Sequence, residues 1–280
     1  MDACEADELR DQLETRLRAE DEEELADKLA GCGEPFSLTC TNCGVRHEIT
    51  TSCKRKWCPA CLRWVAGRRS ARFRGAVSEM RWPLFVTLTQ PNSDDPESVR
   101  HLRAAFGKLR HRKLWTSRTT GGVASIEVTN IGNGWHPHLH AVIDCEWLAA
   151  KTPPPDWQRG SAHVAERCRA AQEELSAVWR RCLGAPEAIV HVKRCNKETI
   201  TQEVVKYSVK GVDLLDSPDP IGDMIRVLER TRLITTFGTF FGRGREFDEE
   251  ASKDKPGCGE CGEVGAWIPT EVAEILTRTK

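Results

Sequence analysis

The sequence has no long apolar segment. No stretch approaches the roughly 20 apolar residues that a membrane-spanning helix needs, so we expect no contact with a membrane. Residues 1–5 are acidic and are not followed by an apolar h-region, so we expect no signal peptide and a cytoplasmic location. With 39% hydrophobic and 30% charged residues, the 280-residue chain has the composition of a soluble globular protein. Its length predicts one catalytic domain with smaller appendages.

Net charge is also nearly absent, at −1, which by itself argues against binding nucleic acid. The distribution of the charges reverses that interpretation. Residues 1–30 carry twelve acidic and four basic side chains, whereas residues 53–81 carry nine basic and one acidic. Residues 99–113 hold six basic side chains and no acidic one. Charges segregated in this way predict local basic surfaces on a neutral protein.

Cysteine, in contrast, is abundant, with thirteen residues. In a reducing cytosol such a number favours metal binding over disulfides. Two Cys-x-x-Cys pairs, 40–43 and 58–61, are separated by fourteen residues, which is close to the spacing of a four-cysteine zinc ribbon. The spacing therefore predicts structural Zn²⁺ on Cys40, Cys43, Cys58 and Cys61, with Cys53 as a fifth candidate and His47 as a weaker substitute. Reduced cysteines without a metal are the alternative.

The remaining cysteines are less informative. Cys258-x-x-Cys261 is half a site, which could be completed by Cys32 or another cysteine, join two chains through a metal, or have no role. Four cysteines within periodic segments are expected to be buried structural residues. They are Cys145, Cys168, Cys182 and Cys195.

Basic and aromatic residues are interleaved within and after the paired cysteines. Trp57 and Trp64 could stack on unpaired bases, while the neighbouring cations could bind phosphates. The predicted DNA-binding residues are Lys54, Lys56, Arg68, Arg69 and Arg72. A solvated basic helix is the alternative.

The hydrophobic periodicity predicts an alternation of strands and helices between residues 84 and 212. Strands are expected at 84–89, 122–129, 135–143 and 188–192, and helices at 95–115, 161–182 and 198–212. The order β-α-β-β-α-β-α predicts an α+β fold, with an antiparallel sheet covered by helices on one face. Further helices are expected at 5–30, where the helix would be acidic and exposed, at 65–80, and at 220–231.

These patterns divide the chain into four parts. They are an acidic helix (1–33), a Cys-rich zinc-binding module with a basic helix (34–80), a catalytic core (81–215), and a helical and Gly-rich tail that carries the last Cys-x-x-Cys pair (216–280).

Three histidines alternate along one predicted strand. Since side chains two apart lie on one face of a strand, His136, His138 and His140 share a face, where imidazoles can bind a divalent metal. If residues 130–134 close a hairpin, Glu127 lies opposite His138, and polar and apolar residues sort to separate faces. Glu127, His138 and His140 then form a two-histidine, one-carboxylate set, with His136 beside it. Surface histidines on an exposed strand are the alternative.

Tyrosine is the scarcest chemically useful residue, since Tyr207 is the only one. On a helix, Glu203, Tyr207 and Lys210 fall in one stripe, while valines cover the opposite side. A phenolate is a competent nucleophile toward phosphorus, and a nearby lysine and a metal offset its high pKa. Glu203 could activate water as a general base. A tyrosine with a purely structural role is the alternative.

Taken in order, three segments resemble the motifs of plasmid rolling-circle replication initiators, which form the single-tyrosine branch of the HUH endonuclease superfamily. They are Phe85-Val86-Thr87-Leu88-Thr89, Gly134-Trp135-His136-Pro137-His138-Leu139-His140 and Glu203-x-x-x-Tyr207-x-x-Lys210. The resemblance covers roughly residues 80–215 and the cysteine module. The second and third motifs are specific, whereas the first is a hydrophobic strand.

This resemblance implies a ferredoxin-like nuclease core with Mg²⁺ or Mn²⁺ at the His-x-His site. It implies that Tyr207 attacks a phosphodiester of single-stranded or hairpin origin DNA, which leaves a 5′-phosphotyrosine and a free 3′-OH. It also implies that Glu203 serves hydrolytic release at termination. A host helicase and a second copy of the chain are further partners that this interpretation allows.

Other functions remain open at this point. A transposase of the HUH type would use the same chemistry, whereas a relaxase usually places its tyrosine before the histidines. A zinc-ribbon DNA-binding regulator would bind without cleaving. A metal-dependent hydrolase of small molecules would leave the basic segments unexplained.

Overall fold

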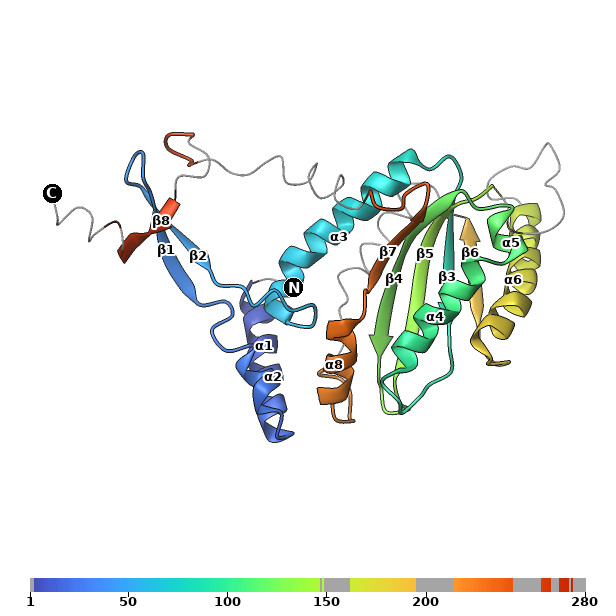
Figure 1. Cartoon of the computed structure of the whole chain (residues 1–280), viewed down its shortest axis with the longest axis horizontal. Helices are drawn as coiled ribbons and strands as arrows, with labels where there is room; N and C mark the ends of the chain where they lie inside the picture. The colour runs from blue at the N-terminus through green and yellow to red at the C-terminus, as the bar shows by residue number, and fades with distance from the viewer. Residues whose placement is uncertain are drawn as a thin grey trace.

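The structure is a computed structural model that describes residues 3–146, 148, 162–194, 214–243, 258–262, 267–271 and 273. Its strands form two antiparallel sheets, one of five strands and one of three. Figure 1 shows the five-stranded sheet with its helices at one end of the molecule and the small sheet at the other. The predicted α+β class with an antiparallel sheet is therefore confirmed.

The larger sheet is built from β3 to β7. The bounds of its strands are Pro83–Thr89 (β3), Gly121–Thr129 (β4), His136–Asp144 (β5), Val190–Arg194 (β6) and Ile234–Gly238 (β7). Their spatial order is β6-β3-β5-β4-β7, and every neighbouring pair is antiparallel. The four strands expected from periodicity are present, and β7 is an addition that the sequence did not predict.

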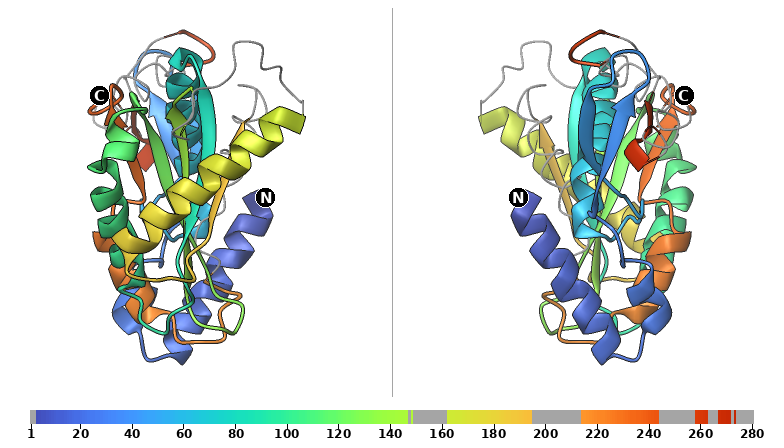
Figure 2. Two further views of the ribbon diagram at one scale, coloured as in Figure 1. Left: turned by 90° about the vertical axis from the view of Figure 1, so that its right-hand side faces the viewer. Right: turned by 90° about the vertical axis from the view of Figure 1, so that its left-hand side faces the viewer.

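Helices α4 (Ser98–Arg110) and α6 (Ala162–Leu183) cover one face of this sheet. Alternate residues of β3, such as Leu84, Val86 and Leu88, are fully buried beneath them. The helix predicted at 95–115 is interrupted at residues 111–112, after which α5 (Lys113–Thr116) adds one turn. Figure 2 shows α6 crossing the strands obliquely.

The opposite face of the sheet is covered at one end by α3 (Pro59–Glu79). Phe73 and Val77 on this helix pack against Phe85 and Val142 in a second, smaller core. Polar side chains, including the histidines, occupy the same face further along β4 and β5. Sequence periodicity placed the beginning of this helix at residue 65, six residues after its observed start.

The N-terminal segment differs from the single exposed helix that was expected. It forms two helices, α1 (Ala3–Ala19) and α2 (Glu23–Asp27), separated by a turn in which Asp21 has a φ of 59°. Their leucines, which include Leu13, Leu17 and Leu25, are buried in the main core. The expectation of an exposed helix was therefore wrong, because the apolar stripe between the acidic residues packs into the protein.

The small sheet was not predicted, because the sequence of residues 36–64 shows no regular hydrophobic pattern. It consists of β1 (Pro35–Cys40), β2 (Arg46–Thr50) and β8 (Trp267–Pro269), in the order β2-β1-β8. All residues of β2 are exposed, so its sequence carries no alternation of buried apolar and exposed polar residues. The strand β8 brings a segment from near the C-terminus beside β1.

Helix α8 (Gly222–Arg230) links the two halves of the molecule, since it contacts the N-terminal helices and leads into β7. The helix predicted at 198–212 lies outside the described residues. Within the described ranges, no helix combines the length and the apolar character that crossing a membrane requires.

Candidate functional site

The hairpin of β4 and β5 has the register that the sequence predicted. Glu127 pairs with His138, while Ser125 pairs with His140 and Thr129 with His136. Since side chains alternate between the faces, Glu127 and the histidines share a face, and Leu139 enters the opposite core. The candidate metal ligands therefore come from adjacent strands of one rigid hairpin.

The hairpin loop is fixed at both ends. Gly134 has a φ of 79°, and a Cβ added there would lie 3.0 Å from the backbone of Ser93, so glycine is required. Ser93 forms an isolated bridge with Trp135, and the side chain of Asn130 donates a hydrogen bond to Asp219. These contacts hold the start of β5 and hence the orientation of the first histidine.

His140 is the most constrained histidine of the site. It is only 5% exposed, and its Nε2 lies 3.0 Å from Oε2 of Glu127, which is itself 8% exposed. On its other side, Nδ1 lies 3.3 Å from the hydroxyl of Thr87 in β3. A proton on Nδ1 that is donated to Thr87 leaves Nε2 unprotonated, so that its lone pair is available to a metal ion beside Glu127.

The other two histidines extend the site along β5. The rings of His138 and His140 are nearly parallel, with centroids 6.0 Å apart, and those of His136 and His138 are 4.1 Å apart. Burial, followed by repulsion from the two neighbouring imidazoles, lowers the pKa of His138 to about 4. Burial also lowers the pKa of His136. Both rings are therefore neutral at pH 7, the state in which imidazole binds a metal.

One pair of these donors is spaced as two ligands of a divalent ion would be. Two ligands at right angles around an ion that binds them at about 2.1 Å are about 3 Å apart. The 3.0 Å between Nε2 of His140 and Oε2 of Glu127 matches that separation. A carboxylate oxygen is a suitable ligand for Mn²⁺ or Mg²⁺, and neutral imidazole nitrogens bind first-row divalent ions. Glu127 and His140 can thus form one edge of a coordination sphere, whereas among the described residues only cysteines gather three or more possible ligand atoms within 4.8 Å of one another.

The predicted catalytic residues Glu203, Tyr207 and Lys210 lie outside the described residues. The same holds for Cys195, and the side chain of Cys168 is likewise not described. Cys145 and Cys182 are buried, as expected for structural cysteines.

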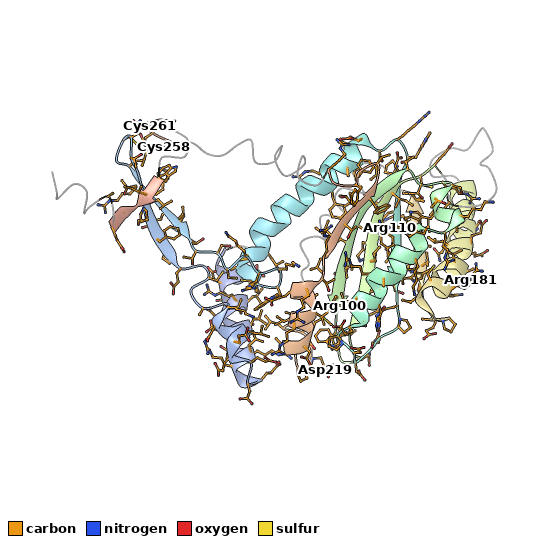
Figure 3. The ribbon with its side chains drawn as sticks, in the orientation of Figure 1. Arg100, Arg110, Arg181, Asp219, Cys258 and Cys261 are labelled. Atoms are coloured by element: carbon orange, nitrogen blue, oxygen red, sulfur yellow. The ribbon has the colours of Figure 1, made fainter. Side chains whose placement is uncertain are left out.

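The cysteines form two clusters rather than one. Cys58 and Cys61 meet Cys32 and Cys53, while Cys40 and Cys43 at the tip of the β1–β2 hairpin meet Cys258 and Cys261. The predicted grouping of Cys40, Cys43, Cys58 and Cys61 was therefore wrong, because β2 separates the two pairs and each finds partners elsewhere. Figure 3 shows Cys258 and Cys261 at the small sheet, far from the larger one.

The geometry of both clusters suits a tetrahedral metal. In the first, Sγ of Cys32 lies 3.6 Å from that of Cys58 and 3.5 Å from that of Cys61. In the second, Cys43 and Cys258 are 3.4 Å apart and Cys40 and Cys261 are 3.7 Å apart. Thiolates bound at about 2.3 Å to tetrahedral Zn²⁺ are about 3.8 Å apart, whereas a disulfide measures about 2.05 Å. Both clusters can bind a metal such as zinc.

One thiol of the first cluster is favoured in its ionised form. Hydrogen bonds with the thiols of Cys53 and Cys58 hold the pKa of Cys61 well below that of a free thiol, whereas the hydrogen bonds that Cys58 makes with Cys53 and Cys61 raise its own pKa. The backbone N–H of Cys53 donates to Sγ of Cys32 at 3.4 Å. Such donors stabilise the thiolate form that binds metals.

The predicted DNA-binding lysines have different environments. Nζ of Lys56 donates to the carbonyl oxygens of Leu228, Glu229 and Thr231 at the end of α8, so this lysine has a structural role, and its role as a DNA contact stays a prediction. A cation at the C-terminus of a helix satisfies carbonyls that have no partner within the helix. Lys54, in contrast, is exposed. Arg68, Arg69 and Arg72 lie on α3, and their side chains are outside the described part of the chain.

Two residues of these sites escaped the sequence reasoning. Thr87 was seen only as part of a hydrophobic strand, although Thr87 and Thr89 alternate with apolar residues and thus mark a polar face. Cys32 was considered as a partner of Cys258, but it completes the other cluster. Cys32 lies between two glycines, Gly31 and Gly33, and this pattern was the sequence feature that could have indicated a tight turn at a metal site.

The site thus consists of an antiparallel sheet that presents Glu127 and the histidines on one face, together with two cysteine clusters that could bind a metal. A family model described as "Replication protein" matches residues 45–150. Over this segment the chain is similar to that family, which confirms the resemblance to plasmid rolling-circle replication proteins and supports a role in initiating replication. The match includes Thr87, Glu127 and the histidine strand and ends before Tyr207. Comparison with curated proteins and with solved structures gave no match.

Proposed function

We propose that this protein initiates rolling-circle replication by nicking single-stranded or hairpin origin DNA with Tyr207 and later rejoining or releasing the strand. The observation that carries the proposal is the arrangement of Glu127, His138 and His140 on one face of β4–β5, within the segment that matches the replication protein family. This arrangement is that expected of an HUH endonuclease core.

The residues divide the chemistry between them. A divalent ion such as Mg²⁺ or Mn²⁺, held by Glu127, His138 and His140 with His136 beside them, would polarise the phosphodiester oxygens. Thr87 and the strand pairing keep His140 oriented toward Glu127. Because the carboxylate and His140 are almost completely buried, water is excluded from this side of the site, which strengthens electrostatic interactions there.

In the nicking step, the phenolate oxygen of Tyr207 attacks phosphorus and the bond to the 3′ oxygen breaks. The phenol proton passes to solvent, and the departing 3′ oxygen takes up a proton to become the 3′-OH. Lys210, one turn along the predicted helix, would stabilise the phenolate. At termination Glu203 would remove a proton from water, which attacks phosphorus and returns Tyr207 to its phenol form.

A covalent-adduct assay tests this proposal. The protein is mixed with labelled single-stranded DNA from its own replicon and Mn²⁺, then separated on a denaturing gel. We expect a shifted band that disappears in Tyr207→Phe and in the presence of a chelator. Since the chain has one tyrosine, an adduct lost with Tyr207→Phe is attributed to a unique residue.

The other outcomes point to other functions. DNA binding without adduct or cleavage would support a zinc-ribbon regulator instead. Cleavage that survives Tyr207→Phe would leave a metal-dependent nuclease without the tyrosine mechanism. An adduct formed equally well on transposon-end DNA would move the biological role to an HUH transposase.

Metal binding is tested independently of catalysis. Titration calorimetry with Mn²⁺ is expected to give one site in the wild type, and affinity is expected to fall at least tenfold in His140→Ala and Glu127→Ala. His101→Ala provides a matched control, since His101 is exposed on α4 and outside the site. Equal affinity in His140→Ala and His101→Ala would remove His140 as a ligand.

We further propose that Zn²⁺ is the metal of both cysteine clusters and that its role is structural. All four ligands in each are thiolates, which favours Zn²⁺ over Mg²⁺ or Mn²⁺, and a four-thiolate tetrahedral site leaves no open position for a substrate.

A further inference from the structure

A pocket of about 300 Å³ lies between α4, α8 and β7, and four of its lining residues are arginines. They are Arg100, Arg103 and Arg110 on α4 and Arg230 at the end of α8. On a helix, residues 100, 103 and 110 fall within one stripe, so the three side chains share a face of α4. Figure 3 shows Arg100 and Arg110 along this side of the helix.

The pocket lies on the opposite face of the sheet from the histidines. Thr235 lines it and pairs with Ala124, whose side chain belongs to the core beneath the helices. Glu127 and the histidines face away from that core. The pocket is therefore separate from the candidate nuclease site.

Arg110 is held in place by aromatic rings rather than by acidic groups. Its guanidinium carbon lies 5.3 Å from the ring centroid of Phe106 and 5.4 Å from that of Phe237. Among the described residues no carboxylate pairs with it, and its buried Nε has no hydrogen-bond partner. Burial, and then repulsion from Arg103, lower the pKa of Arg110. A fixed cation that lacks an acidic partner is suited to bind an anion.

The rest of the pocket shares this excess of positive charge. Arg103 and Arg230 are exposed, and no ion pair of either is found within the described part of the chain. Arg100 has one acidic partner, Glu97, at 3.0 Å. Ion pairs therefore compensate only a fraction of the positive charge around the pocket. An anionic ligand would neutralise the remainder.

We propose that this pocket is a second phosphate-binding site, which takes successive phosphates of a DNA strand on the helix-covered face of the protein. At about 1.5 Å per residue, the row from Arg100 to Arg110 is about 15 Å long, which exceeds a single phosphate group. Guanidinium groups bind phosphate oxygens in pairs, and phosphates repeat along a nucleic-acid backbone. The chemistry thus favours a strand over a mononucleotide.

DNA binding, rather than nicking, tests this site, so the result does not depend on the proposed function. In a Tyr207→Phe background, the affinity for a labelled single-stranded oligonucleotide is measured by anisotropy at several salt concentrations. For single strands the slope of log K against log salt is about −0.7 for each phosphate neutralised. The pair Arg103→Ala and Arg230→Ala is therefore expected to reduce the slope by about 1.4 and to weaken binding at least tenfold at low salt.

The matched control removes two exposed cations elsewhere, with Lys108→Ala on α4 and Arg181→Ala on α6, which leave the pocket intact. An equal change of slope in both pairs would overturn the proposal, because it would indicate general attraction to a basic protein. All four residues are exposed, so both double variants are expected to fold, which their thermal unfolding verifies.

A competition experiment distinguishes a DNA strand from a free nucleotide or inorganic phosphate as the ligand of the pocket. Unlabelled oligonucleotide is expected to displace the probe from the wild type at far lower phosphate concentration than a mononucleotide or inorganic phosphate. Equal displacement by the mononucleotide, lost in Arg103→Ala with Arg230→Ala, would show a nucleotide pocket and overturn the assignment to a DNA strand.

Discussion

At the scale of single residues, Thr87 shows how a neighbouring strand completes a site. Its hydroxyl reaches Nδ1 of His140 from β3, so the strand next to β5 determines which nitrogen of the imidazole is available. Partners of this kind orient the ligand and commonly change metal affinity when they are removed.

We therefore expect Thr87→Val, which keeps the shape of the side chain, to weaken Mn²⁺ binding about tenfold to a hundredfold. Titration calorimetry measures the affinity. Thr236→Val is the control, since Thr236 lies on β7 away from the histidines and is also half-buried. Identical affinities in the two variants would show that Thr87 does not position His140.

Lys56 illustrates a charge that serves stability. Its ammonium group binds three carbonyl oxygens at the end of α8, and Lys56→Met would leave them without this donor. We expect the free energy of unfolding to fall by about 1–3 kcal/mol. Urea unfolding provides the measurement, with Lys54→Met as the control because Lys54 is exposed. A drop in DNA affinity without loss of stability would instead support Lys56 as a DNA contact.

Such residues mark where sequence reasoning reached its limit. The alternation of polar and apolar residues was sufficient to predict that Glu127 faces His138, because only one parity of register buries Leu139. Nothing in the local sequence distinguishes Lys56 from Lys54, since the carbonyls that bind Lys56 come from residues more than 170 positions later.

At the scale of elements, α1 fixes the segment that follows the predicted tyrosine helix. Arg16 donates to the carbonyl oxygens of Leu214, Leu215 and Asp219, and the carboxylate of Glu20 accepts from the backbone of Ile221. The acidic N-terminal region therefore forms part of the scaffold and anchors the chain shortly after Tyr207.

We expect Arg16→Ala to lower the free energy of unfolding by about 2–3 kcal/mol, because half-buried carbonyls lose a charged donor. Arg18→Ala is the matched comparison. Arg18 is exposed, and its ion pairs with Glu14, Glu23 and Asp27 are solvated, so stability is expected to change little. Thermal unfolding of both variants decides; equal effects would contradict a specific anchoring role for Arg16.

Strands and helices with one buried face could be predicted from the sequence, whereas strands without a covering layer could not. The strands β3 to β6 of the larger sheet pack under α4 and α6 and carry an apolar pattern, whereas β7, with three half-buried residues in succession, does not. The small sheet has no such cover, and β1, β2 and β8 are stabilised by strand pairing and by cysteines that lie far apart in the sequence. The cysteine spacing indicated metal but could not show which pairs meet.

At the scale of the whole molecule, the two cysteine clusters predict a stoichiometry of two zinc ions per chain. Cys258→Ser is expected to lose one ion and Cys58→Ser the other, as counted by native mass spectrometry. Cys145→Ser is the control, since Cys145 is buried outside both clusters. One ion in the wild type, or the same loss in Cys145→Ser, would contradict the assignment.

The second cluster also has a consequence for the order in which the protein is made. Cys43 and Cys258 are 215 positions apart, yet they meet in one cluster. During synthesis, the hairpin that carries Cys40 and Cys43 leaves the ribosome early, and its site has two of its four cysteines until Cys258 and Cys261 emerge. Closure of this site therefore reports that translation has passed Cys261, and a chain that stops earlier has an open pair of thiols at the hairpin tip.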